Sequence, residues 1–252
     1  MDFERITLDY YARFLGMEPG ELGKPGLALC PSGLRDKAMP GYPEPWDIYL
    51  FCLPGQVVVS YGSRAADRID RLAELLTADS PPTVDSTPQE AAKALEKVYG
   101  REPHRGLKFI FRKAAGNLGR ARPLTGEDAP LFVQFFREAT GAAQVDWVEE
   151  YFLEIAEKGY TFGVEEDGVL LSATDAPDMP FLGDKVQEIG IRTLPAVRGK
   201  GYASQACAAC AQAMVEKGIC PMWSTSADNM ASQRLAYHVG FEKLADTLAV
   251  TL

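Results

Sequence analysis

The chain has 252 residues, a hydrophobic content of 46% and a formal net charge of -9 at pH 7. This composition is typical of a globular protein with one large domain or two small ones. The negative charge and a sequence pI of about 4.9 disfavour nucleic-acid or anionic-membrane partners, which require a basic surface. The longest apolar runs, such as LFVQFF, fall well short of the roughly 20 residues that a membrane helix needs.

The N-terminus and the cysteines favour the cytoplasm. The first ten residues, MDFERITLDY, carry acidic residues where an export signal is basic, and they lack its apolar run. The five cysteines are odd in number and have no framework spacing, which indicates reduced thiols. We therefore expect a cytoplasmic protein, and the sequence leaves a monomer and a homodimer both open.

The first half of the chain predicts a small α/β domain. Residues 46–61 predict two strands joined at Pro54 and Gly55, and residues 65–76 predict a helix with an apolar stripe. The polar stretch 77–90 is the best linker candidate, and it precedes a predicted helix over 90–99 and an alternating run over 107–113. We place a domain boundary near residue 118, with an N-terminal accessory domain over 1–118 and a second domain over 119–252.

The second half begins with two predicted helices and a hairpin. Thr125 and Asp128 have capping-box spacing, ahead of a helix with Leu131, Phe132, Phe135 and Phe136 on its inner face. A second helix is predicted over 145–157. Asp167 and Gly168 predict a hairpin turn, with the acidic residues 165–167 as no more than its tip. A third strand is predicted over 186–193, so this domain is also α/β.

A glycine-rich stretch, RGKGYAS at residues 198–204, separates that strand from an alanine-rich helical run. Gly199 and Gly201 permit a turn in which backbone amides point at a ligand. The first amides of a helix lack intrahelical partners and the helix dipole is positive there, so a diphosphate can accept several hydrogen bonds. Arg198 and Lys200 add positive charge. The pattern predicts a phosphate-binding loop.

Three other interpretations of the loop can be compared with its sequence. A P-loop requires Ser or Thr directly after a Gly-Lys pair, whereas Gly201 follows Lys200 here. A dinucleotide fingerprint nearly fits Gly199, Gly201 and Ser204, but it expects an acidic residue at the end of the next strand, which reads PMWSTS. A surface turn without a ligand stays open on the loop alone.

The stretch VRGKGYA resembles the Gln/Arg-x-x-Gly-x-Gly/Ala signature of the GNAT superfamily of N-acetyltransferases, with Arg198, Gly201 and Ala203 at its defining positions. Downstream, DNMASQRLAYHVGF is similar to the second landmark of the family, through Asn229, Gly240 and Phe241. The resemblance covers 119–252. The segment PMWSTSADNMAS and the long N-terminal half are most similar to the zwittermicin-resistance acetyltransferase branch.

The resemblance implies a GNAT-like acyl-CoA N-acyltransferase fold: a mixed, mostly antiparallel sheet flanked by helices, here with an N-terminal α/β region of accessory or related design. It implies acetyl-CoA as acyl donor and an amine of an unidentified small molecule as acceptor. It also implies a cofactor site in which backbone groups of Ile191, Arg192 and Thr193 bind the pantetheine arm, the loop residues Arg198, Gly199, Lys200, Gly201, Tyr202, Ala203 and Ser204 hold the diphosphate, and Asn229 lies near the thioester.

Direct transfer to an amine needs a proton acceptor and a proton for the leaving thiolate. Glu188 is the leading base candidate, although the carboxylate position of the family falls nearer Gln187, so a bulge is needed to present Glu188. A solvated strand carboxylate is the alternative for Glu188. The tyrosine that serves as acid in the family corresponds to Ala236. Tyr237 is the next residue and the candidate acid, but one helical step turns a side chain by about 100°, so we expect another donor.

The remaining candidates carry no site. Cys207 and Cys210 form a C-x-x-C in a helix, and a zinc site would need two further ligands, for which only Cys220 and His238 are even loosely placed, so we predict no metal. The only histidines, His104 and His238, are assigned to no site. The predicted activity is N-acetyl transfer. The alternatives are a noncatalytic acyl-CoA-binding or regulatory module and, with less support, a nucleotide-binding oxidoreductase.

Overall fold

The computed structural model describes residues 1–39, 43–77, 87–113 and 119–252. The chain forms two compact units. The N-terminal unit consists of Asp2–Ile110, Ser224–Met230 and Lys243–Leu252, and the C-terminal unit consists of Met1, Phe111–Trp223 and Ala231–Glu242. The boundary predicted near residue 118 and most of the linker predicted over 77–90 lie outside the described residues. Every helix in the described part of the chain is too short or too polar to cross a bilayer.

The N-terminal unit contains a sheet with strand order β1-β3-β2-β11-β4. Its elements are α1 (Phe3–Leu15), β1 (Gly26–Pro31), β2 (Ile48–Leu53), β3 (Gln56–Tyr61), α2 (Ile69–Thr77), α3 (Thr87–Tyr99), β4 (His104–Phe111) and β11 (Phe241–Val250), with short 3-10 helices at Gly33–Asp36 and Ser63–Arg68. The hairpin predicted at Pro54 and Gly55 is confirmed, because β2 and β3 pair antiparallel on either side of it. The last strand of the chain, β11, pairs antiparallel with β2.

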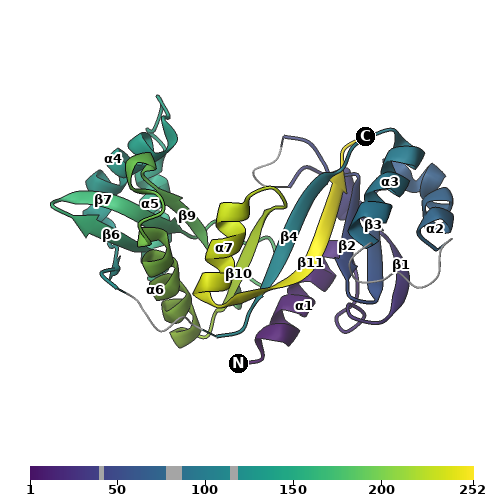
Figure 1. The fold of residues 1–252 in the computed structure, drawn as a ribbon, viewed down its shortest axis with the longest axis horizontal. Helices are drawn as coiled ribbons and strands as arrows, with labels where there is room; N and C mark the ends of the chain where they lie inside the picture. Colours follow the sequence, from purple (N-terminus) through teal and green to yellow (C-terminus); the bar gives the residue numbers. More distant parts are fainter. Residues whose placement is uncertain (40–42, 78–86, 114–118) are drawn as a thin grey trace. The chain divides into compact units, whose positions relative to one another are not determined.

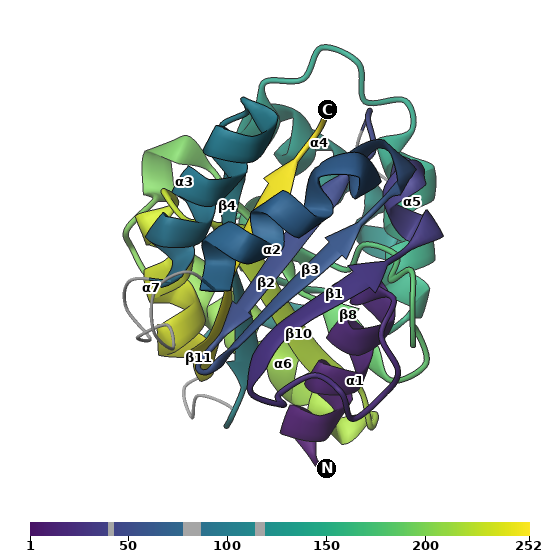
Figure 2. The ribbon, with the colours of Figure 1, turned by 90° about the vertical axis from the view of Figure 1, so that its right-hand side faces the viewer.

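Both faces of β2 are covered, which explains its almost continuous apolar sequence. Successive side chains of a strand point to opposite faces. Ile48 and Leu50 belong to a core that includes residues of α2 and α3, which lie over the strands in Figure 2. The ring of Tyr49 points the other way and lies 5.0 Å from that of Phe14 in α1.

In the C-terminal unit a short edge strand is followed by two helices, both labelled in Figure 1. Its elements are β5 (Arg122–Pro123), α4 (Ala129–Thr140), α5 (Val148–Glu157), β6 (Phe162–Glu166), β7 (Val169–Asp175), β8 (Val186–Glu188), β9 (Gly190–Thr193), α6 (Tyr202–Glu216), β10 (Cys220–Ser226) and α7 (Met230–Val239), with 3-10 helices at Gly126–Asp128 and Pro195–Val197. The end of β10 and the first residue of α7 are assigned to the N-terminal unit. The order β5-β6-β7-β9 is antiparallel throughout, whereas β8 and β10 pair parallel. The mixed, mostly antiparallel α/β architecture is confirmed.

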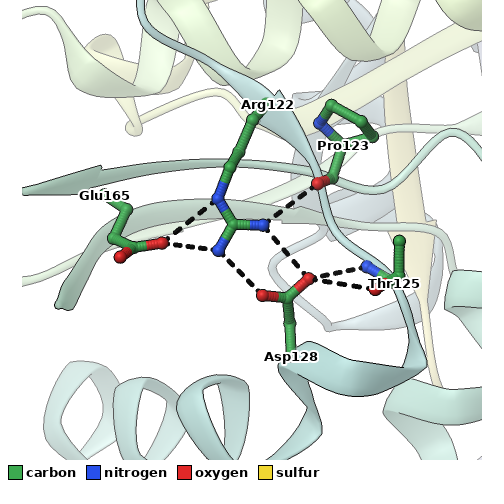
Figure 3. A network of polar contacts seen from close by, with 5 residues as sticks. All are labelled: Arg122, Pro123, Thr125, Asp128 and Glu165. Carbon is green, nitrogen blue, oxygen red and sulfur yellow. Dashed lines mark hydrogen bonds and ion pairs between the residues drawn. The ribbon is translucent and has the colours of Figure 1, made fainter.

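A network of hydrogen bonds and ion pairs connects β5, the start of α4 and β6 (Figure 3). The capping box is present, with the Thr125 amide donating to Asp128 Oδ2 at 2.8 Å. Arg122 of β5 donates to both carboxylate oxygens of Asp128 and also to Glu165 of β6. The predicted hairpin at Asp167 is confirmed, but Glu165 is more than its tip, because it joins β6 to the edge strand β5.

The third strand predicted over 186–193 is two strands. The chain pairs with β10 through Val186–Glu188, is interrupted at Ile189, and pairs with β7 through Gly190–Thr193. The Ile189 amide donates to the carbonyl of Met222 in β10 at 3.1 Å. The strand therefore changes partners at Ile189, and β9 becomes the edge strand of the four-stranded sheet.

Candidate cofactor site

The loop between β9 and α6 has the geometry that its glycines predict. Gly199 and Gly201 have φ values of 79° and 84°, a region that favours glycine, and Gly201 is the N-cap of α6. Among the described residues, nothing lies within 4 Å of a Cβ built at either glycine. Space is therefore open beside the backbone at both positions, and a ligand can approach it closely.

The start of α6 offers backbone donors to this space. Gln205 is the first residue whose amide donates to Gly201, so the amides of Tyr202, Ala203 and Ser204 precede the first intrahelical bond. The helix has 15 residues, long enough for a full dipole at its N-terminus. Several N–H groups and a positive potential thus face one side, as a phosphate group requires.

The cations of the loop are exposed to solvent. Arg198 and Lys200 are both exposed, and Arg198 Nε donates to the carbonyl of Thr193 at 3.4 Å. That bond holds the Arg198 side chain near the end of β9. Both cations belong to the same loop as the open amides, so they can add charge to a phosphate site.

Strand β9 carries the three residues predicted to bind the pantetheine arm. Ile191, Arg192 and Thr193 are half-buried and pair with β7 on one side. The Thr193 hydroxyl lies 2.8 Å from that of Ser172 in β7. Because β9 is the edge strand of its sheet, its other side can offer backbone groups to an extended ligand, although the Thr193 carbonyl already accepts the bond from Arg198.

The first residue of α6 is anchored to the hairpin. The hydroxyl of Tyr202 donates to Glu166 Oε1 at 3.1 Å, and Arg120 Nη1 lies 2.9 Å from the same oxygen. Gln205 Oε1 accepts from the backbone amide of Arg120 at 2.8 Å. Sequence reasoning missed this anchoring by Glu166 and Arg120. The four residues fix where the open end of α6 begins.

The candidate base Glu188 is the last residue of β8 and is half-buried. Its neighbour Gln187 is 2% exposed and donates from Nε2 to the carbonyl of Pro177 at 2.6 Å, while the Tyr160 hydroxyl donates to its Oε1. The family's carboxylate position therefore holds a buried, fully engaged amide. The strand is interrupted at Ile189, directly after Glu188, whereas Gln187 and Glu188 themselves pair with β10 in regular register.

The candidate acid and the second landmark lie on and around α7. Ala236 is fully buried whereas Tyr237 is 52% exposed, so the two neighbouring side chains point in different directions. Asn229 is exposed just before α7 and belongs to the N-terminal unit. Phe241 is buried against Trp223, with ring centres 5.5 Å apart. The Gly-Phe landmark thus has a structural role in the core.

The two cysteines of the C-x-x-C pair lie on the buried face of α6. Cys207 and Cys210 are fully buried, and burial raises the pKa of both thiols, that of Cys210 to about 12. Such thiols are inert as nucleophiles or ligands. Within the described residues no group of three His, Cys, Asp or Glu side chains could hold a metal ion.

The geometry so far defines an α/β protein with an open glycine loop at the start of a long helix, next to an edge strand. Residues 120–242 match a family model described as an acetyltransferase (GNAT) domain. This stretch is therefore a GNAT acetyltransferase domain, and its fold is the GNAT fold, a mixed sheet flanked by helices.

Two solved structures share this fold. An acetyltransferase of the GNAT family from Colwellia psychrerythraea is 21% identical, with a TM-score of 0.50 over 59% of this chain and 56% of its own. A GCN5-related N-acetyltransferase from Sphaerobacter thermophilus is 17% identical, with a TM-score of 0.51 over 63% of this chain and 55% of its own. The match covers less than two thirds of either structure, and at these identities it shows the fold alone. No curated protein matches the sequence.

Proposed function

We propose that the protein is a cytoplasmic N-acetyltransferase that moves an acetyl group from acetyl-CoA directly to an amine of a small molecule. The observation that carries the proposal is the loop at 198–204, where two glycines with positive φ leave open space beside the first amides of α6. Inside a GNAT acetyltransferase domain, this loop is the natural place for the diphosphate of an acyl-CoA. We also propose kinship with the zwittermicin-resistance branch, on the segment 221–232 and the N-terminal half.

The residues present fit this cofactor. The loop from Arg198 to Ser204 would hold the diphosphate, and the outer edge of β9 from Ile191 to Thr193 would hydrogen-bond the pantetheine arm. Asn229 would contact the cofactor near its thioester. Acetyl-CoA supplies the acyl group as a thioester when bound.

The chain itself would handle two protons. Glu188 would accept the proton of the amine, either directly or through an ordered water. Tyr237 is the candidate donor to the leaving thiolate, but its exposed position one residue after the buried Ala236 favours water or another side chain for that role. A thiolate tolerates a weak donor because the reference thiol pKa is only about 8.5.

The acceptor is proposed to be a cationic amine. The net charge of -9 would draw a cation toward the protein. The test is the dependence of kcat/KM on ionic strength with the best acceptor. We expect a decrease as salt screens the attraction, and a flat profile would exclude steering by charge.

The activity is tested by release of free thiol from acetyl-CoA across a panel of amines. The proposal predicts amine-dependent thiol release, with an acetylated product of matching mass. CoA binding by calorimetry without thiol release from any amine would instead favour a noncatalytic acyl-CoA-binding module. Binding of NAD in place of acetyl-CoA would favour an oxidoreductase.

A further inference from the structure

We infer that Asp175 and Arg192 are positioning residues that hold β9 in place for the arm of the cofactor, an inference that rests on the function proposed above. Asp175 ends β7 and Arg192 lies in β9, and their side chains form an ion pair through Oδ2 and Nη1. The pair joins the two strands just after the interruption at Ile189. We call Asp175 and Arg192 the β7–β9 clamp.

The surroundings of the clamp bury its carboxylate. The Asp175 side chain is 9% exposed and that of Arg192 is 38% exposed, and the Arg192 guanidinium lies 4.8 Å from the ring centre of Phe136 in α4. Burial raises the pKa of Tyr151 in α5, and the charge of Asp175 adds to that shift. Removal of the Arg192 charge would leave the buried Asp175 carboxylate poorly compensated, whereas solvent reaches the guanidinium.

Gly190 makes room for the clamp. It pairs with Asp175 across the two strands, and a Cβ built on it would lie 2.7 Å from Asp175 Cγ and overlap the carboxylate. Its φ does not lie in the left-handed region that favours glycine. The carboxylate above it, and not its backbone conformation, therefore requires glycine at position 190.

The clamp acts on a short edge strand. The strand has only four residues and lies at the edge of its sheet. At its far end the Thr193 hydroxyl is fixed to Ser172. At its near end the β7–β9 clamp lies over Gly190, directly before the residues that would bind the pantetheine arm. Loosening the clamp should therefore disturb binding of the arm and leave the phosphate loop intact.

The test compares two ligands by calorimetric titration of the full chain. CoA has the pantetheine arm, whereas adenosine 3′-phosphate 5′-diphosphate carries the same phosphates without it. We expect Asp175→Asn and Gly190→Ala to weaken CoA binding by about tenfold, the worth of one or two ordinary hydrogen bonds, and to change the binding of the arm-free ligand by less than about twofold. Asp178→Asn, which removes an exposed carboxylate paired with Lys158, is the matched control and should change neither.

The outcomes separate the inference from the proposed function. If the clamp variants weaken both ligands equally, or neither, the β7–β9 clamp does not position the arm, and the proposed function stands. If the wild type binds neither ligand, the proposed function itself fails. Gly190→Ala keeps both charges of the clamp, so it tests the inference even if Asp175→Asn does not fold. In an Asp175→Ala background it should have little further effect on CoA binding, and an additive effect would contradict the clamp.

Discussion

Arg122 and Asp128 form a two-bond ion pair, with Nη2 to Oδ1 at 2.7 Å and Nη1 to Oδ2 at 3.1 Å. The same carboxylate caps the amide of Thr125, and the same guanidinium reaches Glu165. One arginine therefore connects β5, the start of α4 and the end of β6. Because α4 also packs on β9 through Phe136, this network supports the strand of the candidate cofactor site.

Replacing this arginine should lower stability modestly. In Arg122→Met the network loses its cation, but the side chain is 39% exposed, so solvent already weakens its ion pairs. We expect the free energy of unfolding to fall by about 1 kcal/mol. Urea denaturation measures the change, with Arg137→Met on the exposed face of α4 as control. Equal midpoints for Arg122→Met and wild type would show that the network contributes nothing.

The ion pair between Arg122 and Asp128 should make the free energy of unfolding depend on pH. Side-chain hydrogen bonding from Arg122 is the main cause that lowers the pKa of Asp128 below its ordinary 3.8. A carboxyl group with a lowered folded-state pKa stabilises the fold above its unfolded pKa, and this contribution is lost as the pH falls through the folded value. The difference in unfolding free energy between wild type and Arg122→Met should thus be full at about pH 6 and shrink below about pH 4. A difference that stays constant down to about pH 2 would rule out the linkage.

Glu188→Gln tests the proposed base. Removal of a positioned general base lowers the rate by about a hundredfold or more, so kcat should fall by that amount while CoA affinity is unchanged. Asp184→Asn removes a nearby exposed carboxylate and should leave kcat unaltered. A loss of less than about threefold in Glu188→Gln would place the base elsewhere.

Tyr237→Phe tests the proton donor. Since Tyr237 follows the buried Ala236 and points about 100° away from it, we expect kcat to fall by less than about tenfold. Steady-state kinetics on a variant with confirmed CoA affinity measures this. A loss of about a hundredfold would identify Tyr237 as the acid and imply that α7 is offset from the register of the family.

Local patterns in the sequence predicted much of the fold. The capping box at Thr125, the hairpins at Gly55 and Gly168 and the glycine loop before α6 each depend on residues close together in the chain. Short-range turn and cap chemistry specifies such features almost independently of the rest of the fold.

The parts that escaped prediction depend on distant partners. The break at Ile189 arises because β10 pairs with the first half of the strand and β7 with the second. Both partners are distant in the chain, so residues 186–193 alone do not predict the change of partner. Glu166 looked like a turn residue because its partner Tyr202 is 36 positions away. The role of Gly190 is likewise visible only once Asp175 lies above it.

The central claim is that the loop at 198–204 binds the phosphates of an acyl-CoA, and the most direct measurement is calorimetric titration of CoA into wild type and Gly201→Leu. Gly201 has a φ of 84° and open space beside it, so a leucine there would strain the turn and fill the path of the diphosphate. We predict that wild type binds CoA and that Gly201→Leu, with its fold confirmed by circular dichroism, does not. A folded Gly201→Leu variant that binds CoA as tightly as wild type would contradict the account.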